Sequence, residues 1–384
     1  MKKWLTFAFL AGAVLVSACD LASPAKLAVT YTGVPALTTG AASIDVVDID
    51  QAAHRLYAAD RTDQGVDVLD VSSPAARYLK TIPIQADPNG IAVAPDLGEV
   101  FVGVSDGSVD VIDVRQGSAT VDTVVRRIAT GAGSVDLIDY SARQHRLFAS
   151  NGIHGTIAAI DTSSGLVAGL FKVGYALEQP RFNPGDGLLY VTSPDAGALF
   201  QLDPATGTVK NKIALSGCSP SGLAINAKTN QAMVACGSSV TRVNLRDTAD
   251  VSTFLDVSGG DVVAYDASVD RFFVAAPAVK PSSQVGLFGG NPIAFIRSVD
   301  TGAGGNSAAY DETNGIVYTP DTRPGKAGIA GFGLPSGQPT LSASPADLAY
   351  FGALLAVAAL AMFVVGRQAD PVRRQEPTAP RRRA

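Results

Sequence analysis

Three aspartates, Asp45, Asp136 and Asp261, each stand at the start of a short apolar segment in this chain of 384 residues. Three carboxylates that met around one axis would repel one another unless a cation, ordered water or the donor groups of a ligand lay between them. In the other interpretation, which we favour, each aspartate only accepts backbone N–H groups where its segment begins, as Asp and Asn do in turns. The first interpretation predicts a binding site, and the second predicts none.

The equivalent positions in the other segments are polar with one exception. Aligning the segments gives Asp45, Gly90, Asp136, Gln179, Ser221, Asp261 and Asn306. If these positions face one channel, the candidate site for a small ligand or cation consists of Asp45, Asp136, Gln179, Asp261 and Asn306. Oxygen ligands of this kind suit Ca²⁺, which is the candidate cofactor. No other metal or cofactor is expected.

Other residues that could do chemistry do not form a catalytic set. The stretch Gly103-Val104-Ser105-Asp106-Gly107 matches the G-x-S-x-G nucleophile pattern, but that pattern needs a strand-to-helix elbow, and here a second strand should follow. His54 and His145 hold equivalent positions, which indicates packing or turn formation, and His154 stands alone in a turn. We therefore expect no catalytic residue and no histidine-based metal site.

The elements that position these residues repeat along the chain. A large apolar or aromatic residue lies in the middle of the second strand pattern of each copy. With successive spacings of 40 to 47 residues, these residues are Tyr57, Phe101, Phe148, Tyr190, Met233, Phe273 and Tyr318. Four short antiparallel strands per repeat of this length are typical of a β-propeller blade. The sequence thus predicts an all-β, seven-bladed β-propeller. The seventh copy lacks an outer strand, and we expect residues 29–40 to supply it, because closure removes unpaired strand edges.

The residues that carry the repeat resemble the YVTN-repeat β-propeller family, in its bacterial exported lipoprotein form. The matching stretches are Tyr190-Val191-Thr192-Ser193, Ile160-Asp161-Thr162 and Asp203-Pro204-Ala205-Thr206-Gly207, and the resemblance extends over residues 29–335. It implies the propeller fold. It does not imply one activity, because the family and its propeller relatives include enzymes, enzyme subunits and surface-layer components.

The N-terminal end predicts export. Residues 1–18 begin with Lys2-Lys3, continue through an apolar run and finish in small residues, as a secretory signal peptide does. Residues 16–19, Val-Ser-Ala-Cys, resemble a bacterial lipobox, which implies that Cys19 is lipidated and that residues 19–28 form a tether. A plain signal peptide followed by an unmodified cysteine is the alternative.

The C-terminal end predicts a membrane span. Residues 349–366 are 18 residues without a charge, enough for about 27 Å of helix at ~1.5 Å per residue. A Pro/Ser/Gly-rich linker, 336–348, precedes them, and a basic tail, 367–384, follows, which the positive-inside bias places in the cytoplasm. The propeller would then lie on the extracytoplasmic face of a bacterial cell membrane. A cleavable sorting signal is the alternative.

The exported part carries 22 basic and 33 acidic residues, a charge of about −11, so no nucleic-acid partner is expected. Its cysteines, Cys218 and Cys236, flank one predicted hairpin. In an oxidising compartment such thiols should form a disulfide, an arrangement that some YVTN-like proteins also have. Two buried free thiols are the alternative.

These observations favour a non-enzymatic binding or scaffold module that holds a protein partner or a small ligand at the membrane. A lactonase-type hydrolase is one alternative, because some related seven-bladed propellers have that activity. Such a site would need acids together with His, Arg or a metal at the channel mouth, whereas the predicted ring has acids without a histidine. A subunit of a periplasmic redox complex is the other alternative.

Overall fold

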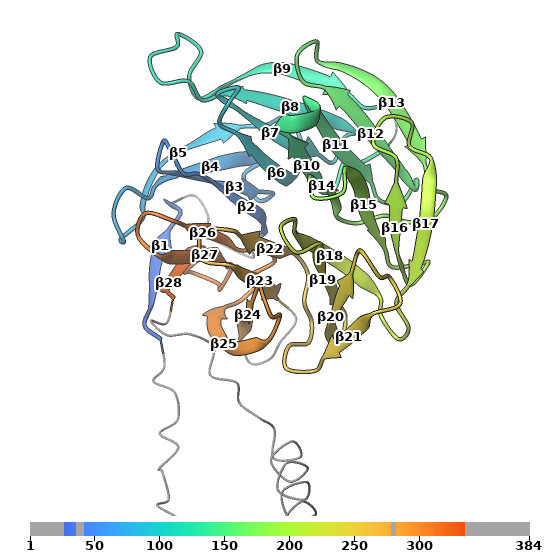
Figure 1. Cartoon of the computed structure of the whole chain (residues 1–384). Helices are drawn as coiled ribbons and strands as arrows, with labels where there is room; N and C mark the ends of the chain where they lie inside the picture. Colours follow the sequence, from blue (N-terminus) through green and yellow to red (C-terminus); the bar gives the residue numbers. More distant parts are fainter. Residues whose placement is uncertain (1–26, 36–41, 132, 278–281, 335–384) are drawn as a thin grey trace, which may run out of the picture. The chain divides into compact units, whose positions relative to one another are not determined.

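The computed structural model describes residues 27–35, 42–131, 133–277 and 282–334, and these form seven four-stranded antiparallel sheets (Figure 1). The first strands of neighbouring sheets contact one another, so each sheet is a blade that runs from a central channel outward. The predicted all-β, seven-bladed propeller is confirmed.

The blades follow chain order. Blade 1 contains β2 (Ile44–Asp50), β3 (Arg55–Asp60), β4 (Gly65–Asp70) and β5 (Arg77–Pro83). Blade 2 contains β6 (Pro88–Ala94), β7 (Glu99–Val104), β8 (Ser108–Asp113) and β9 (Thr123–Ala129). Blade 3 contains β10 (Ile138–Ser141), β11 (Arg146–Asn151), β12 (Thr156–Asp161) and β13 (Leu166–Lys172). A short 3₁₀ helix, η2 (Ala142–Gln144), joins β10 to β11.

Blades 4 to 6 repeat the arrangement. Blade 4 contains β14 (Pro180–Asn183), β15 (Leu188–Ser193), β16 (Ala198–Leu202) and β17 (Val209–Ala214). Blade 5 contains β18 (Pro220–Asn226), β19 (Gln231–Cys236), β20 (Ser239–Asn244) and β21 (Val251–Phe254). Blade 6 contains β22 (Val263–Asp266), β23 (Arg271–Ala276), β24 (Ser283–Gly289) and β25 (Phe295–Gly302).

Blade 7 is built from both ends of the folded chain. Its inner strands are β26 (Ala309–Asp311), β27 (Ile316–Asp321) and β28 (Gly328–Gly333), and its outer strand is β1 (Val29–Gly33), which pairs antiparallel with β28. The predicted closing strand is therefore confirmed at residues 29–33. Residues 36–40 of that prediction lie outside the described residues.

Apolar side chains from facing blades form seven clusters in the described part of the chain, one between each successive pair of blades. The aromatic or methionine residue that marks the repeat is buried in every blade; Tyr190 and Phe148, for example, are 0% exposed. Burying a side chain of this size stabilises the fold by roughly 1.5–3 kcal/mol. The regularity of the sequence is thus the regularity of blade-to-blade packing.

The turn before the second strand of every blade contains one residue with positive φ, between 49° and 78°: His54, Gly98, His145, Gly187, Asn230, Asp270 and Gly315. Only glycine adopts this left-handed conformation without steric cost. The two histidines are therefore turn residues, as predicted. Residues 105–107 likewise form a turn between β7 and β8, so Ser105 does not occupy a strand-to-helix elbow.

Cys218 and Cys236 form a disulfide in blade 5, with their Cα atoms 4.9 Å apart, as predicted. A bridge that closes a loop of this length stabilises a fold by about 3 kcal/mol. Within the described residues no helix is long and apolar enough to cross a membrane. The predicted span 349–366, the signal peptide and Cys19 lie outside the described residues.

Candidate binding site at the entry of the channel

The start of each innermost strand contributes one polar residue to a ring. In blade 3, Ile138 pairs with Ala149, the residue after the marker Phe148, and Asp136 lies two residues before Ile138. Applying the same pairing to the other blades gives the entry ring: Asp45, Asn89, Asp136, Glu178, Ser221, Asp261 and Asn306. All seven residues are polar, and four are carboxylic acids.

The sequence alignment was wrong by one residue in two blades. Gln179 is not a ring residue; its side-chain Oε1 accepts the backbone N–H of Leu223 at 2.8 Å, which ties blade 4 to blade 5. Glu178 takes the ring position instead. In blade 2 the ring residue is Asn89, and Gly90 donates its N–H to the Asp136 carbonyl. A Cβ at Gly90 would lie 2.6 Å from that oxygen, so glycine is needed for this close approach.

One side of the entry ring is a hydrogen-bonded network around Asp45. The Arg61 guanidinium forms an ion pair with Asp45 and donates to Asn89 Oδ1 at 2.9 Å. Asn306 donates to the other Asp45 oxygen at 3.4 Å. Asp45 is only 6% exposed, and its burial raises its pKa to about 6 even with Arg61 beside it. This carboxylate is held by side chains, and no backbone N–H of the described residues donates to it.

The other three acids have surroundings of a different kind. Asp136, Glu178 and Asp261 are half-buried, and within the described residues their carboxylates have no hydrogen-bond partner. Burial first, and then the charges of Asp136, Asp261 and Asp45, together raise the pKa of Glu178 to about 8. Burial likewise raises the pKa of Asp261 to about 7, together with Asp45 and Asp136. The favoured interpretation, that these aspartates serve only as acceptors for strand N–H groups, is therefore wrong.

A cavity of about 400 Å³ opens beside the ring at blades 1 to 3. Its lining includes Arg61, Asn89, Ser105, Asp136 and His154. His154 comes from the turn between β11 and β12, and neighbouring Ile153 is 89% exposed. The sequence predicted no histidine at the channel entry, and this prediction is wrong because His154 lines the cavity there.

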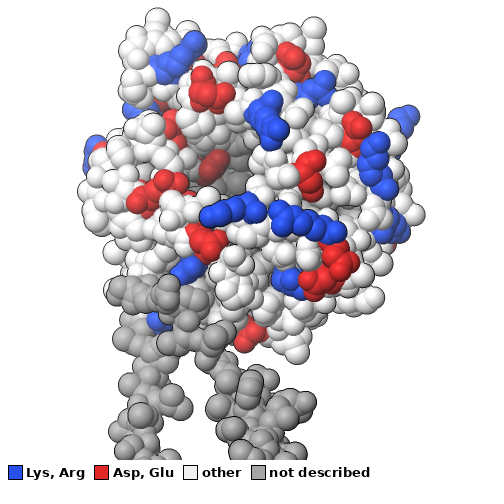
Figure 2. All heavy atoms as spheres, in the orientation of Figure 1, with Lys and Arg blue, Asp and Glu red and all other residues white. Residues whose placement is uncertain are grey.

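The opposite end of the channel also contains carboxylates, and these form hydrogen bonds with backbone N–H groups of the neighbouring blade. Asp48 accepts the backbone N–H of Val93 in the next blade at 2.9 Å, and Asp139 accepts that of Phe182 at 2.7 Å. Arg181 also donates to Asp139, at 3.3 Å. These residues line a cavity of about 330 Å³ at this exit end. Figure 2 shows acidic atoms inside the central hollow and Lys and Arg side chains near its rim.

No group of three or more His, Cys, Asp or Glu side chains is spaced to hold a metal ion in the part of the chain that the structure describes. The four ring acids are near enough to influence one another's pKa, but they surround an open channel rather than one coordination centre. The entry ring therefore fits a larger cationic group better than a single metal ion.

Four residues of the site were not identified from the sequence: Glu178, Asn89, His154 and Arg61. Glu178 and Asn89 are adjacent in the sequence to Gln179 and Gly90, which the sequence alignment had chosen. Only the cross-strand pairing shows which residue of each adjacent pair belongs to the entry ring. Arg61 lies in the turn between β3 and β4, and His154 lies in the equivalent turn of blade 3, between β11 and β12. This shared position is the sequence feature that could have identified Arg61 as a site residue. Both turns bring side chains to the channel entry from the second hairpin of a blade.

Among the comparisons made by sequence and by structure, known proteins resemble this chain only in its fold. No protein-family model matches the sequence, and no curated protein matches it. Among solved structures the chain is similar to one titled Kuenenia stuttgartiensis Hydrazine Synthase, with a TM-score of 0.63 and 14% identity, over 78% of this chain and 98% of that chain. At this identity the likeness shows the propeller fold alone.

Proposed function

We propose that this chain is a binding module whose entry ring holds a cationic group, an ammonium or guanidinium, of a small ligand or a partner protein. The observation that supports the proposal is the set of three half-buried carboxylates, Asp136, Glu178 and Asp261, that have no hydrogen-bond partner in the described residues. Their raised pKa values mean that the ring pays a free-energy penalty for its own charge. A bound cation would relieve that penalty.

Size and charge favour an organic cation. The channel entry is bordered by a cavity of about 400 Å³, which is in the range of small-molecule sites. Arg61 neutralises Asp45 and leaves the three other acids to face a ligand. A lysine or arginine side chain of a partner would reach the ring in the same way as a free amine.

The test is a binding measurement on the purified chain. Wild-type protein should bind amines, guanidinium compounds or Lys- and Arg-containing peptides in isothermal titration. The triple variant Asp136→Asn, Glu178→Gln, Asp261→Asn should bind at least about tenfold more weakly, which corresponds to ~1.4 kcal/mol. Asp195→Asn, an exposed carboxylate in the turn between β15 and β16, is the matched control.

Two results would count against the proposal: failure of every cationic probe to bind, or equal binding by the triple variant. Ca²⁺ is a separate arm of the same titration. Saturable Ca²⁺ binding that the triple variant loses would favour the cation site considered from the sequence over a site for organic cations.

A second candidate function rests on the cavity beside the ring. Asp136, Arg61 and His154 line it together, which is the combination of acid and His or Arg that a lactonase-type hydrolase requires. Incubation with a panel of lactones tests it directly. Hydrolysis that His154→Ala abolishes, with cation binding intact, would assign the cavity to catalysis.

The proposed setting is the extracytoplasmic face of a bacterial membrane. The support is the sequence alone: the signal peptide with its lipobox at Cys19, the apolar segment 349–366 and the basic tail. We also propose kinship with the YVTN-repeat family on the motifs in blades 3 and 4. A place in a redox complex has weaker support, because the hydrazine synthase likeness concerns the fold.

A further inference from the structure

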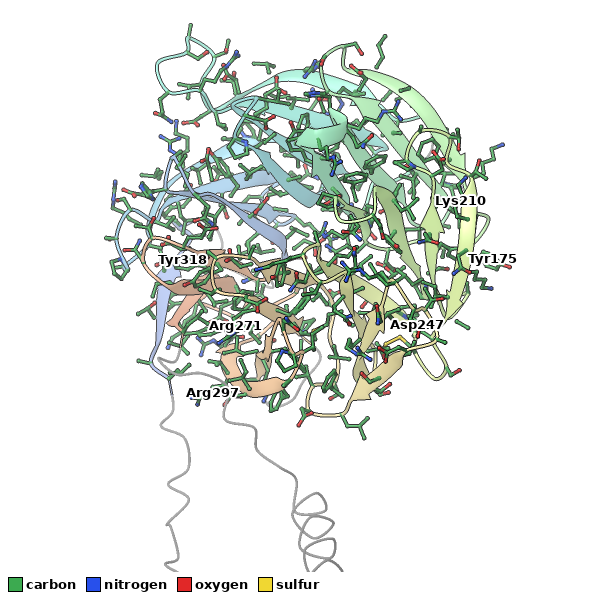
Figure 3. All side chains as sticks on the ribbon, in the orientation of Figure 1. Tyr175, Lys210, Asp247, Arg271, Arg297 and Tyr318 are labelled. Atoms are coloured by element: carbon green, nitrogen blue, oxygen red, sulfur yellow. A yellow bond between two sulfur atoms is a disulfide. The ribbon has the colours of Figure 1, made fainter. Side chains whose placement is uncertain are left out.

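The seam between blades 7 and 1, where the ring closes, contains two buried aspartates with unusual surroundings. Ala58 of β3 and Leu69 of β4 pack there against Tyr318 and Ile329 of blade 7. Figure 3 labels Tyr318 where the two blades meet. Strand geometry places every second residue on one face, so Asp60 of β3 and Asp67 of β4 lie on the same face as Ala58 and Leu69.

Both carboxyls are completely buried and only half satisfied. Asp60 and Asp67 are each 0% exposed. One oxygen of Asp60 accepts the backbone N–H groups of Thr62 and Asp63, and one oxygen of Asp67 accepts the Thr81 hydroxyl at 2.6 Å. Among the described residues, the second oxygen of each carboxyl is buried and has no hydrogen-bond partner.

The two carboxyls are also neighbours. Asp60 pairs with Gly65 and Ala58 pairs with Asp67, so Asp60 and Asp67 are diagonal neighbours across β3 and β4. Each carboxyl would raise the free energy of a charge on the other. A buried anion with an unpaired oxygen costs several kcal/mol unless a cation or a proton neutralises it.

No basic side chain neutralises either carboxyl in the described part of the chain. Arg61, in the adjoining turn, is engaged by Asp45, and Lys80 of β5 is engaged by Asp122. Asp63 in that turn adds another negative charge, and blade 7 faces the pair with apolar groups such as Ala327 and Ile329.

In blade 2 the corresponding aspartate has a basic partner, although its Oδ1 is also buried without a hydrogen-bond partner in the described residues. Asp110 of β8 is the counterpart of Asp67, because both stand three residues before the aspartate that ends their strand. Asp110 pairs across the sheet with Arg127, and the two side chains form an ion pair at 3.2 Å. In blade 1 the cross-strand position is occupied by Thr81, which brings a hydroxyl and no charge.

We infer that Asp60 and Asp67 form a proton-binding pair in the closing seam, which retains a proton in the folded ring and makes closure of blade 7 on blade 1 more favourable in acid than in alkali. The direction of the pKa values agrees, since burial raises that of Asp60 to about 6 and that of Asp67 to about 7. This inference does not depend on what the entry ring binds.

The first experiment is urea unfolding of the full chain between pH 5 and 8.5. The slope of stability against pH gives the number of protons taken up on folding. For Asp60→Asn combined with Asp67→Asn this uptake should fall by about one proton near pH 7, whereas Asp195→Asn should leave it unchanged. The ring variant Glu178→Gln, Asp261→Asn should lower uptake separately and additively, which distinguishes the two groups of acids.

The second experiment is infrared spectroscopy of the wild-type protein at neutral pH, which needs no variant to fold. A carbonyl band from a protonated, buried carboxylic acid should be present, and either single variant, Asp60→Asn or Asp67→Asn, should alter it. An unchanged band together with unchanged proton uptake would overturn the inference. It would equally be overturned if Ca²⁺ or Na⁺ restored stability at pH 8 in the wild type but not in the double variant, because the seam would then hold a cation.

Discussion

Asp136 and Asp139 lie three residues apart on the innermost segment of blade 3, yet the structure gives the two carboxyls opposite surroundings. Asp139 accepts the backbone N–H of Phe182 and the guanidinium of Arg181. Asp136 has no hydrogen-bond partner within the described residues and faces the channel entry. Asp45 and Asp48 in blade 1 differ in a similar way, since the Asp45 carboxylate accepts from the side chains of Arg61 and Asn306, whereas the Asp48 carboxylate accepts two backbone N–H groups.

The difference shows what each end of the channel does. At the exit, aspartates satisfy N–H groups on the exposed edge of the next blade's inner strand, which would otherwise remain unpaired. At the entry, Asp136, Glu178 and Asp261 precede the inner strands β10, β14 and β22, and within the described residues their carboxylates accept no N–H from a neighbouring blade. Acids at the exit therefore stabilise the ring, and acids at the entry are available to a ligand.

The largest difference in stability should be found between the two alanine variants of blade 3, Asp139→Ala and Asp136→Ala. Asp139→Ala should lower the free energy of unfolding by about 2 kcal/mol, because it leaves the Phe182 N–H without its acceptor and removes the ion pair of the partly buried Arg181. Asp136→Ala should change it by less than about 0.5 kcal/mol at pH 7. Urea unfolding of both variants measures the contrast, and equal losses would remove the distinction between the two ends.

A smaller effect is expected from pH. The folded-state pKa values of Asp45, Asp261 and Glu178, about 6, 7 and 8, exceed their ordinary values of 3.8 and 4.5, so the folded ring binds protons more tightly than the unfolded chain. Their contribution to stability is fully present below about pH 4 and is lost as pH rises through about 6 to 8.

The melting temperature of the wild type should accordingly fall across that pH range. The variant Glu178→Gln, Asp261→Asn should show a flatter profile and melt a few degrees higher at pH 8, which corresponds to ~1–2 kcal/mol. Asp195→Asn, the exposed carboxylate in the turn between β15 and β16, again serves as the control. An unchanged profile in the ring variant would mean that the entry acids are not desolvated.

The smallest change in stability is expected at Gln179. Substitutions there distinguish the effect of losing a hydrogen-bond acceptor from the effect of adding a carboxyl group. Gln179→Leu removes the acceptor of the Leu223 N–H and should cost about 1 kcal/mol. Gln179→Glu keeps an acceptor there, and at pH 5, where a carboxyl buried beside Glu178 would be protonated, it should cost less than Gln179→Leu. Thermal melts of the two variants make the comparison. A larger loss for Gln179→Glu would indicate that the position belongs with the entry acids after all.

Much of the fold could be predicted because each blade repeats the same short-range pattern. The buried markers from Tyr57 to Tyr318, the left-handed turns at His54 and His145, and the disulfide all follow from residue type and spacing. The closing strand followed from the missing outer strand of blade 7, because an open edge is unfavourable.

The entry ring was predicted only in part, for a physical reason. In blades 2 and 4 two adjacent residues, Asn89-Gly90 and Glu178-Gln179, compete for the ring position, and cross-strand hydrogen bonding decides between them. His154 and Arg61 reach the site from hairpin turns, where side-chain direction depends on the neighbouring blade. The half-satisfied pair Asp60 and Asp67 depends on the absence of a cation across the sheet, which residue spacing cannot reveal.

The closing strand has a mechanical consequence. Val29 pairs with Phe332 and Gly33 pairs with Gly328, so both ends of the folded chain leave the ring at the same end of the β1–β28 ladder. Tension applied between those ends would load the hydrogen bonds one after another, from Val29 toward Gly33, rather than all together. The ring therefore opens like a zip under a pull at its two ends, at a much lower force than a ladder loaded in shear.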